Sequence, residues 1–208
     1  MKAIEHILAL KPTLVIGSVP YKQETVEKLL EQPLRFLAMN PRTLADVEND
    51  IRLLGGIAGR TRAANQVVQK MGREFARIAH KTRGVKRRIP VYCEAWPNPR
   101  ISSPPWVAEL VAMCGGEMVV PAGEKVSDEH VAAGRPEVIV LAWAATGDKA
   151  DPRQTYAVKS WRDVPAVQEK RVFVVRDELL NTPGPPLVDV AWELFRLFGT
   201  LEMRKTRA

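Results

Sequence analysis

Short apolar runs alternate with amphipathic segments near the start of the chain. The run at 14–16 is continuous and apolar, which is typical of a strand buried in a parallel sheet, and the segment LRFLAM at 34–39 predicts a second strand. The segments at 3–10, 25–31 and 43–55 place apolar residues at the three- and four-residue spacing of a helix with one buried face. Helices and strands that alternate in this order predict an α/β unit.

One long amphipathic segment follows, from residue 61 to residue 81, and Gly84 marks its end. It contains no proline, and its apolar positions recur every three or four residues: Ala64, Val67, Val68, Met71, Phe75 and Ile78. At 1.5 Å per residue, the predicted helix is about 30 Å long. Since a crossover helix within one sheet is usually shorter, we expect this helix to join two lobes.

The α/β pattern then starts again. Apolar runs at 89–96, 117–120, 136–143 and 171–175 predict strands, and amphipathic segments predict helices at 106–114, from Ser127 onward, and from Pro185 to Gly199. The predicted fold class is α/β, with two Rossmann-like lobes joined by a single long helix. The predicted boundaries are 1–59 for the first lobe, 60–84 for the helix and 85–208 for the second lobe.

The composition argues against a membrane-spanning protein and against a metal site. The chain has 208 residues, of which 46% are hydrophobic, and no apolar run approaches the ~18 residues of a membrane span. Charged residues and Pro12 also interrupt the first apolar segment, so the chain as given carries no predicted export signal. Cys93 and Cys114 are expected to be buried thiols, although a disulfide is possible. The three histidines are too scattered to predict a metal site.

Positive charge exceeds negative charge by seven, and much of the excess lies at 70–88. A basic segment of this kind can be a solvated helix face, or it can bind nucleic acid or anionic lipid. Phe75 is the only aromatic residue that interrupts it, and its phase suggests the core. We therefore favour the solvated face and expect no nucleic-acid partner.

Ligands of parallel sheets usually bind where loops leave the carboxyl ends of the strands. The expected loops are rich in aromatic and polar residues, and the candidate ligand-binding residues are Ser18, Tyr21, Trp96, Asn98, Arg100, Trp143, Asp177 and Asn181. An apolar wall with a few fixed polar groups suits a large organic ligand. The chain has no recognisable nucleophile, base and orienting group, so no catalytic residue is predicted. An enzyme with Glu94, Asp177 or Glu178 as its acid or base is the alternative.

Four segments together resemble a known family: IEHILALKPTLVIGS (4–18), PVYCEAWPNPRISSPPWVAELVAMCGGE (90–117), EKVSDEHVAAGRPEVIVLAW (124–143) and AVQEKRVFVVRDELLNTPGPPLVDVAWELF (166–195). In this order they are similar to the cobalamin and iron-siderophore substrate-binding proteins of ABC importers. The resemblance implies two α/β lobes joined by one long helix, with the ligand held between them. It also implies a periplasmic or surface-anchored, non-catalytic protein without a cofactor, whose ligand is cobalamin, a related corrinoid or a ferric siderophore.

The resemblance further implies a permease as partner. Family members dock through one acidic residue on each lobe, and Glu5 and Glu129 occupy the corresponding positions in this sequence. Carboxylates can fix orientation by bidentate pairing with arginines.

Two features depart from the family pattern. The strand-helix-strand unit that opens the family's first lobe does not precede Met1, and Ser18 stands where cobalamin-binding members can present an aromatic residue. We therefore expect an incomplete first lobe with an uncovered apolar strand edge. Because proteins cover or pair such edges, this predicts a homo-oligomer that associates through the first lobe.

Overall fold

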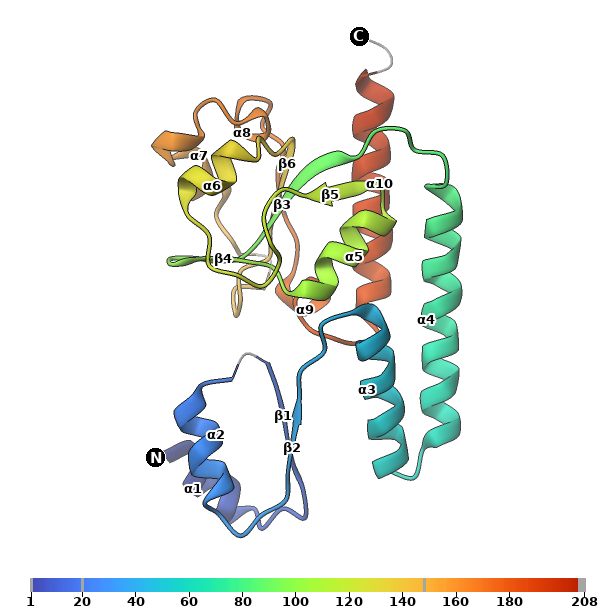
Figure 1. Cartoon of the computed structure of the whole chain (residues 1–208), viewed down its shortest axis with the longest axis vertical. Coiled ribbons are helices and arrows are strands. Elements are labelled where there is room, and N and C mark those ends of the chain that lie inside the picture. Colours follow the sequence, from blue (N-terminus) through green and yellow to red (C-terminus); the bar gives the residue numbers. More distant parts are fainter. Residues whose placement is uncertain (1, 20, 148, 206–208) are drawn as a thin grey trace. The chain divides into compact units, whose positions relative to one another are not determined.

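The computed structural model describes residues 2–19, 21–147 and 149–205, with side chains from Ile4 to Leu201 within those ranges. The chain forms two compact units, Met1–Pro41 and Arg42–Ala208 (Figure 1). Each unit combines helices with parallel strands, and this confirms the predicted α/β class.

The first unit contains two helices and two strands. Their order is α1 (Lys2–Ala9), β1 (Val15–Ser18), α2 (Gln23–Leu30) and β2 (Phe36–Met39). The strands pair in parallel, with Val15 opposite Phe36 and Ser18 opposite Met39. Each predicted element is present, and its observed bounds lie within two residues of the predicted ones.

The second unit opens with two long helices, α3 (Leu44–Ile57) and α4 (Thr61–Lys81). Thr43 and Asp46 begin α3 with a reciprocal capping box. The Asp46 N–H donates to Thr43 Oγ1 over 3.0 Å, and the Thr43 N–H donates to Asp46 Oδ2 over 2.9 Å. The bounds of α4 are those that the sequence predicts, because its apolar spacing runs without interruption from end to end.

The sheet of the second unit has the strand order β4-β3-β6-β7, and β5 also pairs with β3. The strands are β3 (Ile89–Pro97), β4 (Arg100–Ser102), β5 (Gly116–Met118), β6 (Val138–Leu141) and β7 (Val172–Val174). The pairings of β3 with β5 and β6, and of β6 with β7, are parallel, whereas β4 is antiparallel to β3. The sequence predicted a proline-rich loop where β4 lies.

The other helices cover the sheet and its edges. They are α5 (Pro105–Met113), α6 (Asp128–Ala133), α7 (Pro152–Tyr156), the 3-10 helix η1 (Lys159–Trp161), α8 (Pro165–Gln168), α9 (Asp177–Leu180) and α10 (Leu187–Lys205). The prediction that Gly199 ends the last helix is wrong. Phe198 and Leu201 on either side of it are buried, so the apolar face that packs on the unit continues past the glycine.

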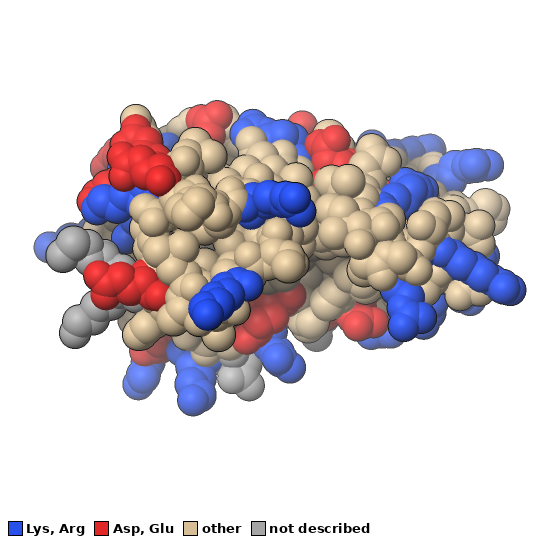
Figure 2. All heavy atoms as spheres, turned by 90° about the horizontal axis from the view of Figure 1, so that it is seen from below, with Lys and Arg blue, Asp and Glu red and all other residues tan. Residues whose placement is uncertain are grey.

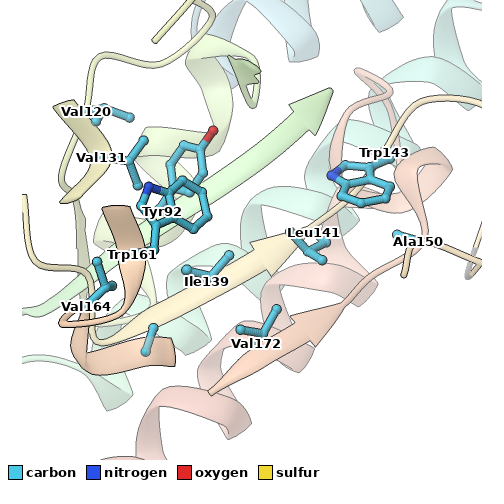
Figure 3. Close-up of a cluster of buried hydrophobic side chains, with 11 residues drawn as sticks. Tyr92, Val120, Val131, Ile139, Leu141, Trp143, Ala150, Trp161, Val164 and Val172 are labelled. Atoms are coloured by element: carbon cyan, nitrogen blue, oxygen red, sulfur yellow. The ribbon is translucent and has the colours of Figure 1, made fainter. Parts of the chain in front are cut away.

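A cluster of buried side chains fills one face of the sheet (Figure 3). Tyr92, Ile139 and Val172 come from three neighbouring strands, and Trp161 packs against them from η1. The rings of Tyr92 and Trp161 meet edge to face, with centroids 5.9 Å apart. Trp143 lies at the far end of the cluster, beyond the end of β6.

Both cysteines, Cys93 and Cys114, are buried and free, as the sequence predicts. Burial raises the pKa of the Cys114 thiol to about 12, and it raises the pKa of Cys93 as well. Both groups therefore stay protonated at neutral pH, where they act as small apolar side chains.

The second compact unit begins at Arg42, whereas the sequence analysis assigned residues 42–59 to the first lobe and 60–84 to a separate helix. The reason lies in packing, because α4 contacts α3, α5 and α10 through the face that carries Val68, Met71 and Ile78. The lobe boundaries at 59 and 84 stay a prediction.

The contact between α3 and α4 depends on a close backbone approach at Gly55. A Cβ atom at Gly55 would overlap the Cβ of Ala64, whereas a Cβ at the neighbouring Gly56 would meet no atom within 4 Å. Gly55 is buried and Gly56 is exposed. We expect Gly55→Ala to lower the free energy of unfolding by roughly 1–3 kcal/mol, because the helices must separate.

Gly56→Ala is the matched control, since the same change there adds helix propensity without a clash. It should raise the free energy of unfolding by up to about 1 kcal/mol. Urea unfolding of the two variants and the parent chain gives both values. Equal effects of the two substitutions would contradict the close approach at Gly55.

Candidate functional site

The carboxyl ends of β3, β6 and β7 lie at one edge of the second unit's sheet. The parallel ladder continues past the strand ends, because Ala142 N–H donates to Glu94 O and Val175 N–H donates to Leu141 O, each over 2.9 Å. The chain segments that leave the three strands therefore start side by side. This is the edge at which the sequence predicts a ligand.

Glu94 lies in β3 at this edge, and its side chain is fully buried. Three side chains donate to its carboxylate. Tyr92 Oη lies 3.0 Å from Oε2, Trp143 Nε1 lies 2.8 Å from Oε1, and Arg100 Nη1 lies 2.5 Å from Oε2. The charge is thus both paired and hydrogen-bonded, which is the condition for burying a carboxylate.

Arg100 connects this carboxylate to α6. Its Nε donates to Asp128, the first residue of α6, and its guanidinium lies 4.2 Å from the centroid of the Trp161 ring. Trp161 Nε1 in turn donates to the backbone oxygen of Asp128 over 2.9 Å. We call Tyr92, Glu94, Arg100, Asp128, Trp143 and Trp161 the Glu94 network.

Opposing effects act on the pKa of Glu94. Burial raises it above its usual range, while the nearby Arg100 charge and the hydrogen bonds from Arg100, Trp143 and Tyr92 lower it. Burial is the larger effect. Burial lowers the pKa of Arg100, but its two negative partners, Glu94 and Asp128, together raise it by more, so Arg100 stays charged.

The β3–β4 hairpin carries two of the predicted ligand-binding residues, Trp96 and Asn98. Trp96 follows a bulge in β3 and is 41% exposed, and Asn98 is exposed as well. The indole Nε1 of Trp96 donates to the backbone oxygen of Asn98 over 2.8 Å. This bond fixes the ring on the hairpin and leaves ring surface open to solvent.

Two further predicted residues, Asp177 and Asn181, lie on or just after α9. Asp177 Oδ2 accepts the N–H of Ala145 over 2.9 Å, and Asn181 Nδ2 donates to the backbone oxygen of Ala142 over 2.6 Å. Both side chains hold the segment that follows β6. The Oδ1 atom of each is buried and has no hydrogen-bond partner among the described residues.

In the first unit, Ser18 is exposed at the end of β1, whereas Tyr21 has a structural role. The Tyr21 hydroxyl accepts the N–H of Met39 over 2.8 Å, and it lies within hydrogen-bond distance of the Met39 and Gly17 carbonyl oxygens. It therefore joins the ends of β1 and β2. Both Ser18 and Tyr21 line a pocket of about 370 Å³ within this unit, beside Phe36.

Glu5 on α1 and Glu129 on α6, the predicted docking residues, are both exposed. Each lies on a helix, one in each unit. Glu129 is the neighbour of Asp128 in the Glu94 network.

A larger pocket, of about 460 Å³, lies at the other end of the second unit's sheet. Ile89 at the start of β3 lines it together with Cys114 and Phe198. It is lined mainly by apolar side chains, and the sequence analysis did not predict it. Because it adjoins the amino end of β3, it is separate from the strand-end site.

The predicted ligand-binding residues of the second unit therefore fall into two groups, those exposed to solvent and those bonded within the protein. Trp96 and Asn98 are exposed, while Arg100, Trp143, Asp177 and Asn181 are committed to bonds within the protein. The sequence analysis missed the other members of the network: Tyr92, Asp128 and Trp161. One signal was available, since a glutamate inside an apolar strand requires a cation nearby.

The described part of the chain holds no group of three or more histidine, cysteine or carboxylate side chains arranged to bind a metal ion. Nor does any helix within residues 2–19, 21–147 and 149–205 have the length and apolar character needed to cross a membrane.

We expect Arg100→Met to lower the free energy of unfolding by roughly 3–5 kcal/mol at neutral pH, because Glu94 keeps its buried charge without a cation. The substitution also raises the pKa of Glu94 further. The variant should therefore recover part of the loss as the pH falls and Glu94 takes up a proton. Urea unfolding at several pH values measures both effects.

The double variant Glu94→Gln/Arg100→Met is the control. Glutamine is neutral, its amide oxygen can accept from Trp143, and its amide nitrogen can donate to the Tyr92 hydroxyl, so the double variant should be more stable than Arg100→Met at neutral pH. A double variant no more stable than the single one would contradict a charge-based role for Arg100.

Two relatives named as ABC-transporter or vitamin-binding proteins match most of this chain. It is 22% identical over 203 residues to an ABC transporter substrate-binding lipoprotein of Bacillus subtilis (strain 168), and 25% identical over 203 residues to a vitamin B12-binding protein of Pectobacterium carotovorum. Each match covers 92% of this chain. The chain spans 63% of the Bacillus relative and 69% of the Pectobacterium relative.

Solved structures share the fold. The periplasmic vitamin B12-binding protein of Vibrio cholerae matches 96% of this chain with a TM-score of 0.73 and 19% identity, and 78% of that chain is covered. The periplasmic heme-binding protein of Roseiflexus sp. RS-1 matches 93% of this chain with a TM-score of 0.72 and 21% identity, and 79% of that chain is covered. The family model for periplasmic binding proteins matches residues 2–179, and the chain therefore belongs to the periplasmic binding protein family.

Proposed function

We propose that this chain is the substrate-binding component of an ABC importer and that it binds cobalamin, a related corrinoid or an iron chelate. Its membership of the periplasmic binding protein family carries the proposal. The relatives named as an ABC transporter substrate-binding lipoprotein and as vitamin B12-binding proteins support it. The proposed location, periplasmic or anchored at the cell surface, rests on the same relatives.

In the second unit, we place ligand contact on the β3–β4 hairpin. Trp96 offers an aromatic face, and Asn98 offers an amide, next to strand ends that the Glu94 network holds in place. A flat, apolar face suits a large ring system such as a corrin or porphyrin. Arg100, Trp143, Asp177 and Asn181 then act as positioning residues. Ser18 and Tyr21, which line the pocket of the first unit, are the proposed ligand contacts of that unit.

We propose Glu5 and Glu129 as the residues that dock on the permease. Both are exposed carboxylates on helices, and there is one in each unit. An arginine on the partner can bind such a carboxylate through two parallel hydrogen bonds.

We further propose that the protein is not an enzyme. Of the three carboxylates weighed as acid or base, Glu94 is fully buried behind three donors, and Asp177 accepts a backbone N–H. Glu178 is exposed and pairs with Arg176, with 3.5 Å between Oε2 and Nε. No nucleophile lies beside any of them in the contacts of the described residues.

Ligand titration tests this function. Cobalamin, heme and a ferric siderophore are each added to the parent chain, and binding is followed by tryptophan fluorescence and by the melting temperature. We expect one class to bind and Trp96→Ala to weaken that binding roughly two- to tenfold, as loss of an aromatic contact does.

Three control variants separate binding from other effects. Tyr156→Ala removes an aromatic side chain of similar exposure, 38% against 41%, from α7, and it should leave binding unchanged. Glu5→Gln and Glu129→Gln should also retain ligand binding and weaken only capture by the permease. Failure of all three ligand classes to bind or to shift the melting temperature would refute the ligand assignment.

We also propose that the chain self-associates through its first unit. Among the residues that the structure describes, the sheet there has two strands, and Leu10, Ile16 and Leu30 are 80%, 45% and 68% exposed. An unpaired strand edge beside exposed apolar side chains favours pairing with another copy.

Sedimentation equilibrium tests the association. We expect a dimer or larger species at micromolar concentration, and Ile16→Lys should shift the protein toward monomer, because a charge on β1 opposes edge pairing. Leu53→Lys, at a residue of 46% exposure on α3, is the matched control and should not change the mass. A strict monomer for the parent chain would count against the proposal.

A further inference from the structure

The solvent-facing side of α4 carries a row of cations that the proposed transport function does not use. At 100° per residue, Arg62, Lys70, Arg73, Arg77 and Lys81 fall within a sector of about 100° on the helix surface. All five side chains are exposed. We call these five residues the basic stripe. It runs for about 28 Å along the helix, at 1.5 Å per residue.

The basic stripe faces away from the protein core. The buried residues of α4, among them Met71, Phe75 and Ile78, occupy the opposite side of the helix. Figure 2 shows the molecule from below, and blue lysine and arginine side chains are among those that project at its right-hand edge.

Little negative charge on α4 offsets the stripe. Glu74 is the only acidic residue in the helix, and both of its oxygens are engaged. Arg77 Nη1 donates to Oε1 over 3.0 Å, and Trp192 Nε1 of α10 donates to Oε2 over 3.1 Å. Arg62, Lys70, Arg73 and Lys81 thus leave four positive charges on the stripe that Glu74 does not neutralise.

Two hollows meet at the carboxyl end of the stripe. One lies on the stripe itself, has a volume of about 440 Å³ and is lined by Ala76, Arg77, His80 and Lys81. The other is the apolar pocket of about 460 Å³, where Phe195 and Phe198 lie beside Lys81 and Arg196. Lys81 lines both, so cationic and apolar surfaces adjoin there.

We propose that the basic stripe binds the surface of a membrane that contains anionic phospholipids. A straight row of cations on one face of a helix matches a flat, negatively charged surface. A bilayer presents phosphate groups next to apolar chains, and this fits the adjoining hollows at Lys81. Nucleic acid would instead call for exposed aromatic residues on which bases stack, and Phe75, the one aromatic residue of α4, is buried on the opposite face.

Vesicle binding tests this surface. The full chain is mixed with phosphatidylglycerol/phosphatidylcholine vesicles and with vesicles of phosphatidylcholine alone, and bound protein is measured by co-sedimentation. We expect binding to the anionic vesicles only, with an affinity that falls as salt rises. The variant Arg62→Gln/Lys70→Gln/Arg73→Gln/Lys81→Gln should bind at least about a hundredfold more weakly, since each cation near such a surface contributes about a factor of five.

A matched variant controls for total charge. Lys125→Gln/Lys149→Gln/Lys159→Gln/Arg162→Gln removes four exposed cations from elsewhere in the second unit, so both variants carry a net charge of +3 in place of +7. The control should keep most of the vesicle binding. Circular dichroism confirms that both variants remain folded.

Three results would overturn the proposal. The first is no binding of the parent chain to anionic vesicles at low salt. The second is an equal loss in both variants, which would mean that net charge alone drives binding. The third is binding to single-stranded or duplex DNA, but not to vesicles, that depends on the stripe. The ligand titration and the vesicle assay are independent measurements. A failure of the proposed transport function can therefore be told apart from a failure of membrane binding.

Discussion

The buried carboxylate of Glu94, in the sheet of the second unit, requires hydrogen-bond donors and a cation from the residues around it. Glu94 has no access to water, so its charge requires donors from the protein. Tyr92 on the same strand, Trp143 after β6 and Arg100 on β4 provide them. One buried group thereby connects two strands and the segment after a third, and Asp128 extends the connection to α6.

This arrangement explains why most of the polar candidates at the strand ends are unsuitable as free ligand contacts. A guanidinium that neutralises Glu94 and pairs with Asp128 cannot leave for a ligand without exposing a buried charge. Asp177 and Asn181 similarly hold the backbone after β6. The exposed hairpin residues Trp96 and Asn98 then stand on a fixed base, which would lower the entropic cost of the ligand contact proposed for them.

The elements that could be predicted from sequence are those whose signals are local. The bounds of α4 follow from an uninterrupted apolar period, and the apolar run of β3 indicates a buried strand. The antiparallel β4 could not be predicted, because its pairing with β3 depends on a hairpin within a proline-rich segment. The last helix passes Gly199 because burial of Phe198 and Leu201 outweighs the helix penalty of about 1 kcal/mol for glycine.

The same distinction applies to the site. The segments that leave β3, β6 and β7 start side by side as the strand-end rule requires, since the rule depends only on parallel topology, and a ligand at this edge stays a prediction. The rule could not separate a residue that faces solvent from one that holds its neighbour, because that depends on side-chain partners far along the chain. Trp143 and Glu94 are 49 positions apart, and Arg100 and Asp128 are 28 apart. Only the folded chain brings these pairs together.

The close approach of α3 and α4 at Gly55 also bears on how the chain folds. The two helices are consecutive, so bringing Gly55 against Ala64 closes a very short loop. Pairing β3 with β6 and then with β7 closes much longer loops and costs more chain entropy. The helical hairpin thus closes a far shorter loop than the pairing of β3 with β6 or of β6 with β7, and it can form before the sheet's last strands have left the ribosome.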